Sequence, residues 1–305
     1  MCQLRSFLGM NLPVHDTVTD CLRVNILGVG ISAVDLQQAV HSSLSLVASG
    51  TKGYICVTGM HGIMEAQLDT GFRAIQNTSF LTIPDGIPTV WIGRSTGHKN
   101  MEQVRGADFM LGLCKASAET GVRHFLYGGK PGVAPLLRDV LTRRFPGLQI
   151  VGTYTPPFRP LTPEEESDLK HTLEESRVDV LWCGISTPKQ ERFMAQYLHS
   201  LPVSLMVGVG AAFDLNAGLL QDSPYWVQQC GLQWAHRLYQ EPRRLWRRYV
   251  LNIPRFLWLY LMQRAGVRAY ELTLPPLRPA HDESSAALNP ANAEVKEGQL
   301  TNIAA

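Results

Sequence analysis

Residues 178–209 read VDVLWCGISTPKQERFMAQYLHSLPVSLMVGV, and this stretch decides the fold class. The apolar runs Val178–Cys183 and Ser204–Val209 each have the length and composition of a buried strand. Between them, Pro188–His199 has the mixed apolar and polar pattern of an amphipathic helix. Parallel strands need a crossover connection of this length, which is usually a helix. The stretch therefore predicts one βαβ unit of a parallel sheet.

The same alternation runs through most of the chain. Further strands are predicted at residues 24–29, 53–58, 80–83, 124–127 and 149–151. Further helices are predicted at residues 33–48, 62–76, 101–120, 133–145 and 163–176. The predicted fold class is α/β, a doubly wound, mostly parallel sheet with helices on both faces.

Changes of composition predict four parts of the chain. Residues 1–20 lack periodicity and are predicted to form a flexible arm, and residues 21–218 form the α/β domain. Residues 219–270 are predicted to form a basic, aromatic, helical appendage, because strand patterns stop there. Residues 271–305 are poor in aromatics, so they are predicted to be disordered.

Charge is unevenly distributed along the 305 residues. The formal net charge is only +2, but residues 237–268 hold eight arginines and one acid, Glu241. Such asymmetry indicates contact with an anionic partner. The sequence shows neither a signal-peptide pattern nor the roughly 20 apolar residues needed to cross a bilayer. We therefore expect a cytoplasmic protein.

Ligands of parallel sheets bind where strands end and turns lead into helices. Gly28-Val29-Gly30 is similar to the start of a dinucleotide-binding turn, but Ala33 replaces the third glycine. The next strand ends in Thr58 and not in a ribose-binding acid. A plain strand-to-helix turn is favoured, and a nicotinamide-dependent oxidoreductase is kept as an alternative.

A glycine-rich loop follows the strand predicted at residues 124–127. Gly128, Gly129 and Gly132 would let the backbone approach a ligand, and the helix that begins next offers free amides to a phosphate. Diphosphate binding is the favoured interpretation. A structural turn is the alternative.

Polar residues also follow the strand at residues 178–183. Thr187, Pro188 and Gln190 fit an N-cap, a first helical position and a capping box. That local role does not explain the whole polar cluster at the sheet edge. Gly184, Gln190 and Glu191 are therefore candidate site residues.

Two more turns carry groups suited to acid–base chemistry. Asp85 lies between Pro84 and Gly86 after an apolar strand, where a carboxylate on a rigid loop could serve as a general base. Holding the turn is the alternative. His61 follows Thr58-Gly59-Met60, and it is either a helix-start residue or a ligand contact.

The ordered set of motifs resembles the WecG/TagA/CpsF family of bacterial glycosyltransferases over roughly residues 24–256. The motifs are Val57-Thr58, Asp85-Gly86, Arg105-Gly106-Ala107-Asp108, the loop 129–134, Pro188-Lys189-Gln190-Glu191, residues 208–214, Gly231-Leu232-Gln233-Trp234, Arg237-Leu238 and residues 241–245. Their order and spacing together make the resemblance specific.

The resemblance implies a metal-independent, inverting transferase that moves a sugar from a UDP-sugar to an undecaprenyl-diphosphate-linked acceptor. Such enzymes make exopolysaccharide, capsule or teichoic-acid-type polymers and need no cofactor. The sequence also lacks the D-x-D motif that would hold a metal ion.

The resemblance also assigns site residues. It implies Thr58 and Asp85 as the catalytic pair. The substrate-binding candidates are His61, Arg105, Asp108, Gly128, Gly129, Gly132, Gly184, Gln190, Glu191, Gly210 and Asp214. The chain departs from the family pattern at Met60, Asp222 and Gln233.

The appendage is predicted to meet the acceptor diphosphate and the inner face of the cytoplasmic membrane. The arginines expected to bind phosphate oxygens are Arg237, Arg243, Arg244, Arg247 and Arg248. Pro254 is predicted to break the helical stretch, and residues 256–262 are expected to lie on the bilayer. The alternatives are a packed helix with a solvated basic face and a nucleic-acid-binding protein. The interleaved apolar residues favour lipid over nucleic acid. A homo-oligomer is left open.

Overall fold

The computed structural model describes residues 21–274 except 225, 226, 228 and 229. The side chains of residues 244, 245, 247 and 248 also lie outside the described part. Within it, no helix is long and apolar enough to cross a membrane. The arm predicted at residues 1–20 and nearly all of the tail predicted at residues 271–305 fall outside the description.

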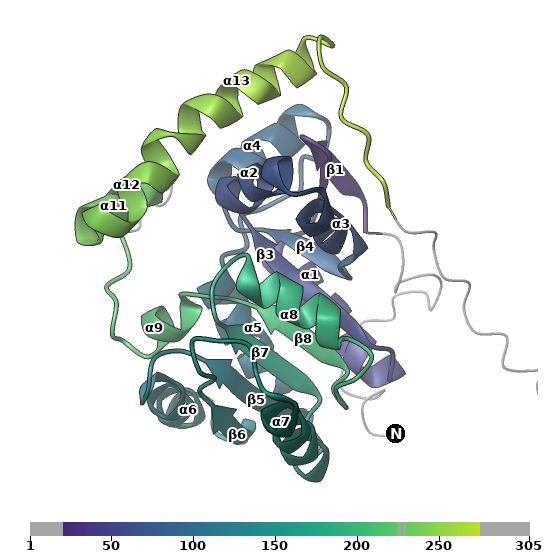
Figure 1. Cartoon of the computed structure of the whole chain (residues 1–305), viewed down its shortest axis with the longest axis vertical. Helices are drawn as coiled ribbons and strands as arrows, with labels where there is room; N and C mark the ends of the chain where they lie inside the picture. Colours follow the sequence, from purple (N-terminus) through teal and green to yellow (C-terminus); the bar gives the residue numbers. More distant parts are fainter. Residues whose placement is uncertain (1–20, 225–226, 228–229, 275–305) are drawn as a thin grey trace, which may run out of the picture. The chain divides into compact units, whose positions relative to one another are not determined.

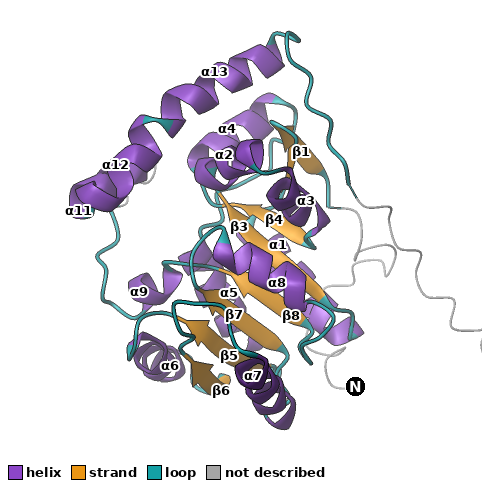
Figure 2. Ribbon diagram, viewed as in Figure 1, coloured by secondary structure: helices purple, strands orange, loops and turns teal. Residues whose placement is uncertain are grey.

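A six-stranded sheet forms the centre of the fold (Figure 2). Its strands lie in the order β4-β3-β8-β7-β5-β6, and every neighbouring pair is parallel. Their bounds are β3 Gly53–Thr58, β4 Leu81–Pro84, β5 Arg123–Gly128, β6 Gln149–Tyr154, β7 Val180–Gly184 and β8 Leu205–Gly208. The strands quoted at the outset, β7 and β8, pair directly with Val180 opposite Leu205. The predicted fold class is confirmed.

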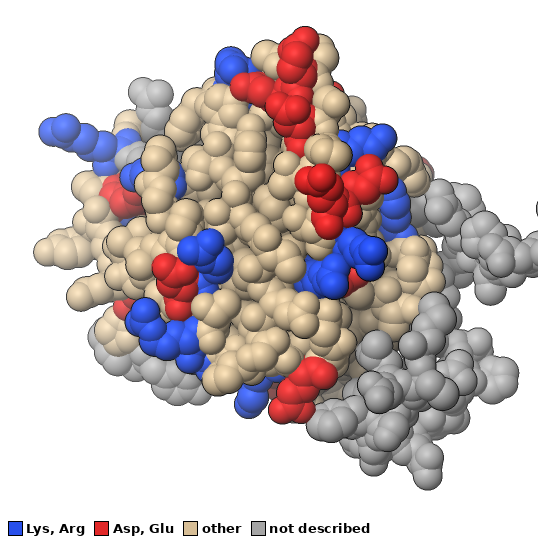
Figure 3. All heavy atoms as spheres, turned by 90° about the horizontal axis from the view of Figure 1, so that it is seen from below, with Lys and Arg blue, Asp and Glu red and all other residues tan. Residues whose placement is uncertain are grey.

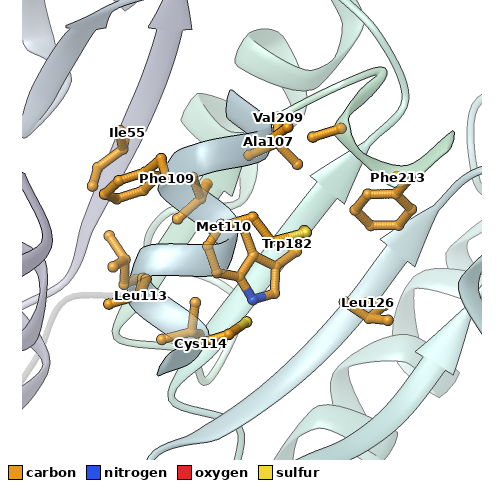
Figure 4. Close-up of a cluster of buried hydrophobic side chains, with 14 of the residues drawn as sticks. Ile55, Ala107, Phe109, Met110, Leu113, Cys114, Leu126, Trp182, Val209 and Phe213 are labelled. Carbon is orange, nitrogen blue, oxygen red and sulfur yellow. The ribbon is translucent and has the colours of Figure 1, made fainter. Parts of the chain in front are cut away.

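Helices cover both faces of the sheet (Figure 1). One apolar layer is closed by α1 (Leu36–Ser49), α5 (Gly106–Ser117), α6 (Val133–Arg144) and α9 (Ala212–Asn216). The opposite layer is closed by α3 (Thr70–Thr78), α7 (Pro163–Glu175) and α8 (Lys189–Tyr197). Trp182 of β7 is fully buried in the first layer, and its ring meets Phe109 of α5 edge-on (Figure 4). Each layer removes a continuous apolar surface from water.

Two helix predictions are wrong, and one helix was not predicted. The helix predicted at residues 62–76 is two helices, α2 (Met60–Leu68) and α3, because Asp69 ends one and caps the other by accepting from the Phe72 amide. The helix predicted at residues 101–120 begins only at Gly106. A further helix, α4 (Ile87–Ser95), starts directly after the Asp85-Gly86 turn and was not predicted.

The strand predicted at residues 24–29 is wrong. The segment forms an antiparallel hairpin of β1 (Arg23–Ile26) and β2 (Val29–Ser32), outside the six-stranded sheet. Leu27 and Gly28 form its turn with φ of 53° and 81°, the positive values that suit a two-residue hairpin. Gly28-Val29-Gly30 is therefore not a dinucleotide-binding turn, and the oxidoreductase alternative loses its motif.

The last described helix, α13 (Asn252–Arg264), packs against the hairpin. Phe256 is 1% exposed and belongs to an apolar cluster with hairpin residues such as Ile26 and Leu27. The Gln263 side chain accepts from the Leu27 amide at 2.9 Å and donates to the Asn25 carbonyl at 3.2 Å. The expectation that all of residues 256–262 lie on a bilayer is therefore wrong for Phe256.

The break in the appendage lies one turn earlier than predicted. α12 (Pro242–Val250) ends before Leu251, and α13 begins at Asn252. Pro254 is the third residue of α13. A proline is tolerated there because first-turn amides have no partner within the helix.

A buried hydrogen-bonded chain predicts acid sensitivity. The Trp182 indole donates to Nδ1 of His124 at 3.0 Å, and Nε2 lies 2.7 Å from the Ser117 hydroxyl. Burial lowers the pKa of His124 to about 3, below its ordinary value of 6.5. The contribution of neutral His124 to the free energy of unfolding is therefore fully present above pH 6.5. It falls as the pH drops towards 3, because in this range only the unfolded chain takes up the proton. One such histidine costs about 2 kcal/mol of unfolding free energy at pH 5.

Urea denaturation at pH 7 and pH 5 measures this loss. His124→Gln keeps a donor and an acceptor but does not titrate, so it should lose about 2 kcal/mol less between the two pH values. His171→Gln, at an exposed position on α7, is the matched control and should follow the wild type. An equal pH dependence in all three proteins would contradict the prediction.

Candidate active site

A pocket of about 230 Å³ lies at the carboxyl edge of the sheet. Residues that follow β3, β4, β7 and β8 line its inner side, as the parallel fold predicts. The start of α5 contributes Arg105, Gly106 and Ala107. Its outer wall comes from the appendage, through Gly231, Gln233, Trp234, Arg237, Tyr249 and Asn252. The pocket therefore lies between the carboxyl edge of the sheet and the appendage.

Asp85 lines this pocket and is held on two sides. Its Oδ1 accepts from the Gly106 amide, the first residue of α5, at 3.1 Å. Its backbone carbonyl accepts from the Gln103 side chain at 2.7 Å. A Cβ at Gly59 would lie 3.7 Å from Oδ2, so the glycine leaves space beside this second oxygen. A fixed carboxylate with one oxygen near open space suits a general base.

Arg105 brings a positive charge to the same pocket. Its side chain is 14% exposed and pairs with Asp108 through Nε at 2.6 Å and Nη2 at 2.8 Å. Nη1 pairs with Asp222 at 2.6 Å. Burial alone would lower the pKa of Arg105, but the hydrogen bonds to Asp108 and Asp222 raise it overall. Asp108 does not line the pocket, so it serves to orient the arginine.

Gln190 forms part of the pocket floor and is 2% exposed. Its Nε2 donates to Oε1 of Glu191 at 3.1 Å, while its Oε1 has no hydrogen-bond partner among the described residues. Gly210 lies alongside, since a Cβ there would be 3.5 Å from that oxygen. A buried acceptor of this kind costs free energy unless a ligand donates to it.

The predicted capping box before α8 is wrong. Pro188 is the N-cap residue, follows Thr187 in a cis peptide and provides no side-chain cap. Thr187 instead donates its hydroxyl to Oε1 of Glu191 at 2.8 Å. Glu191 is fully buried and does not line the pocket, so it supports Gln190 and Thr187 from beneath.

The comparison with protein families agrees with this arrangement. The model of the glycosyl transferase WecG/TagA/CpsF family matches residues 24–270, more than half of the chain. The chain belongs to this family. The match spans the hairpin, the sheet and the appendage, so the whole pocket falls inside it.

Two relatives carry the name N-acetylglucosaminyldiphosphoundecaprenol N-acetyl-beta-D-mannosaminyltransferase. The one from Bacillus spizizenii is 27% identical over 217 residues, which cover 68% of this chain and 82% of the relative. The one from Bacillus subtilis is 25% identical over 199 residues, which cover 65% of this chain and 75% of the relative.

Of the two residues predicted to be catalytic, Asp85 lines the pocket and Thr58 does not. Thr58 is 2% exposed and does not line the pocket. Its side chain lies against α2, because a Cβ at Gly62 would meet the Thr58 methyl at 3.1 Å. The Thr58 hydroxyl has no hydrogen-bond partner in the described part of the chain. His61 does line the pocket, with Nδ1 3.8 Å from the Glu65 carboxylate. A catalytic role for Thr58 stays a prediction.

Packing accounts for two of the glycines predicted to bind substrate. A Cβ at Gly128 would lie 2.6 Å from the backbone of Gly184, and one at Gly184 would lie 2.8 Å from the Phe213 ring. Gly129 and Gly132, the N-cap residue of α6, do not line the pocket either. Of the two later family positions, Gly210 lines the pocket and Asp214 on α9 does not. Diphosphate binding by this loop stays a prediction.

The arginines of the appendage divide into three groups. Arg237 of α11 (Gln233–Gln240) lines the pocket. Arg243 is exposed on α12. Arg244, Arg247 and Arg248 belong to the backbone of α12, but their side chains lie outside the description. Among the appendage arginines whose side chains are described, only Arg237 lines the pocket.

Sequence reasoning missed several pocket residues. Gln103 supports Asp85, and Trp234 and Tyr249 form an aromatic pair on the appendage wall with ring centroids 5.9 Å apart. Gln103 lies in a loop, so no hydrophobic periodicity in the sequence indicates its position. Trp234 belongs to a family motif and could have been chosen on that basis. Within the described residues, no group of three or more His, Cys, Asp or Glu side chains could hold a metal ion.

Proposed function

We propose that this chain transfers a sugar from a UDP-sugar to an undecaprenyl-diphosphate-linked acceptor in the synthesis of a bacterial cell-surface polysaccharide. The observation that carries the proposal is the pocket that Asp85, Arg105 and Arg237 line together. A base and two cations in one cleft match the needs of transfer from a diphosphate-activated sugar. Membership of the family and the names of the two relatives support the class of donor and acceptor.

In this mechanism Asp85 takes the proton of the acceptor hydroxyl. The hydroxyl oxygen forms a bond to the anomeric carbon, and the bond between that carbon and the UDP oxygen breaks with its electron pair leaving on UDP. Attack from the face opposite the nucleotide inverts the anomeric configuration. Arg105 and Arg237 stabilise the charge that develops on the departing diphosphate.

Arginines are proposed to replace a metal ion at the leaving group. The sequence has no D-x-D motif, and the pocket offers the guanidinium groups of Arg105 and Arg237 as donors to phosphate oxygens. The donor is proposed to carry a hexosyl or N-acetylhexosaminyl group. The names of the relatives favour the second.

The appendage is proposed to rest on the inner face of the cytoplasmic membrane. Leu257, Trp258 and Leu261 of α13 are 53%, 62% and 62% exposed, whereas Phe256 of the same helix is buried. Pro254, one turn before them, is also exposed. This apolar ridge follows the arginine-rich α12, a combination typical of helices at an anionic bilayer surface.

Another face of the molecule has a different character. The side seen from below in Figure 1 shows basic and acidic side chains interspersed (Figure 3). Mixed charge of this kind is ordinary for a surface that remains in water. The contrast supports the choice of the appendage as the membrane-facing element.

A transfer assay tests the proposal. UDP release from a panel of UDP-sugars should require a polyprenyl-diphosphate-linked sugar as acceptor. It should continue at an unchanged rate in excess EDTA, because no step relies on a divalent ion. A donor panel without any lipid-dependent UDP release would refute the function. Loss of activity in EDTA with rescue by Mg²⁺ or Mn²⁺ would refute only the metal-free scheme.

A further inference from the structure

Asp222 binds Arg105, a residue that lines the pocket. Arg105 has two carboxylate partners of different kinds. Asp108 lies three residues further along, in the first turn of α5, and binds both Nε and Nη2. Asp222 binds only Nη1, at 2.6 Å, and lies 117 residues away in sequence. The partner held by one hydrogen bond is the easier to replace.

The segment that carries Asp222 connects the core to the appendage. It belongs to neither a helix nor a strand and lies between α9 and α11. The other carboxylate oxygen of Asp222 accepts from its neighbour Ser223 at 2.8 Å and from Gln233 of α11 at 3.5 Å, the limit for a hydrogen bond. Gln233 itself lines the pocket. Asp222 therefore bridges a pocket residue of the core to a pocket residue of the appendage.

We infer that Asp222 is an internal competitor for the diphosphate-binding position of Arg105, and that a bound diphosphate displaces it. This inference rests on the proposed function. A phosphate oxygen presents the same charge and hydrogen-bonding geometry to Nη1 as the Asp222 carboxylate does. Asp222 has a side chain 40% exposed, so water can receive its carboxylate when it leaves. Displacement would also release the segment 219–223 that leads to α11.

Equilibrium binding to the full chain tests the competition. Two soluble probes distinguish the source of the diphosphate: UDP for the donor and geranyl diphosphate for the acceptor. Asp222→Asn removes the competing charge with little change of shape. It should tighten the Kd of the relevant probe about fivefold, the effect of losing one partly exposed ion pair. Asp222→Glu retains the charge and should stay within about twofold of the wild type.

Asp139→Asn is the matched control, because it removes a carboxylate from an exposed pair with Arg138 on α6. It should leave the Kd of both probes unchanged. Weaker or unchanged binding by Asp222→Asn, with wild-type binding intact, would overturn the inference alone. A wild-type chain that binds neither probe would instead point to failure of the proposed function.

Hydrogen exchange in the wild type gives a second measurement that needs no variant. Saturating UDP or geranyl diphosphate should speed amide exchange at residues 219–223, since the link to Arg105 is broken. A residue that merely supports the pocket would instead show slower exchange when the ligand binds. Slower or unchanged exchange with both probes would overturn the displacement.

Discussion

Asp85→Asn is expected to lower the turnover number at least about 100-fold, the usual contribution of a general base. The amide can still accept from Gly106 through its oxygen, so the loop and α5 should keep their positions. It cannot take the proton of the attacking hydroxyl. The Kd of UDP should change less than about threefold, because the variant alters the base and leaves Arg105 in place.

Steady-state rates with the lipid acceptor and UDP binding by calorimetry separate the two effects. Asp139→Asn, the same chemical change at an exposed site on α6, should keep normal turnover. The proposed role of Asp85 would be wrong if Asp85→Asn also turned over at the normal rate. It would then hold only the turn before α4, which the sequence left as the alternative.

Replacing Trp258 and Leu261 by glutamate is expected to weaken vesicle binding by at least about 100-fold. Each large apolar side chain buried in a bilayer contributes about 1.5–3 kcal/mol, and two introduced carboxylates are repelled by anionic lipid. The fold should remain intact because both residues are 62% exposed and are not part of the cluster around Phe256. Removing the whole appendage would be a less clean test, since it would uncover the hairpin core.

Co-sedimentation with vesicles that contain anionic phospholipid measures this loss. The matched double variant, Leu136→Glu with Val151→Glu, changes two exposed apolar residues of α6 and β6 and should bind vesicles as the wild type does. Circular dichroism confirms that both variants are folded. Equal binding by the wild type and Trp258→Glu/Leu261→Glu would show that the ridge meets something other than lipid.

Much of the fold follows from local sequence. Five of the six strands of the sheet, such as β3 and β5, were predicted to within about two residues of their ends. In β6 the predicted strand was too short, because its outer half carries polar residues at an edge. Parallel strands put their carboxyl ends at one edge, so the sequence also predicted that Asp85 and Gln190 would lie at the same edge, where both line the pocket.

Local sequence predicted the structure less well where residues far apart in the sequence pack together. The run 24–29 is as apolar as a central strand, but Leu27 and Gly28 turn it into a hairpin because its apolar side chains pack under α2 and α13. Thr58 ends its strand as predicted, yet the alternation of side chains places its hydroxyl behind the pocket.

Sequence alone thus determined the parallel sheet, the edge that holds the pocket and the family, since hydrophobic period and motif order are properties of neighbouring residues. The tertiary structure alone decided that Asp222 meets Arg105 across 117 positions and that α13 buries Phe256 while exposing Trp258. Such contacts depend on how separate elements pack together. The hydrophobic pattern around these residues does not distinguish a buried side chain from an exposed one.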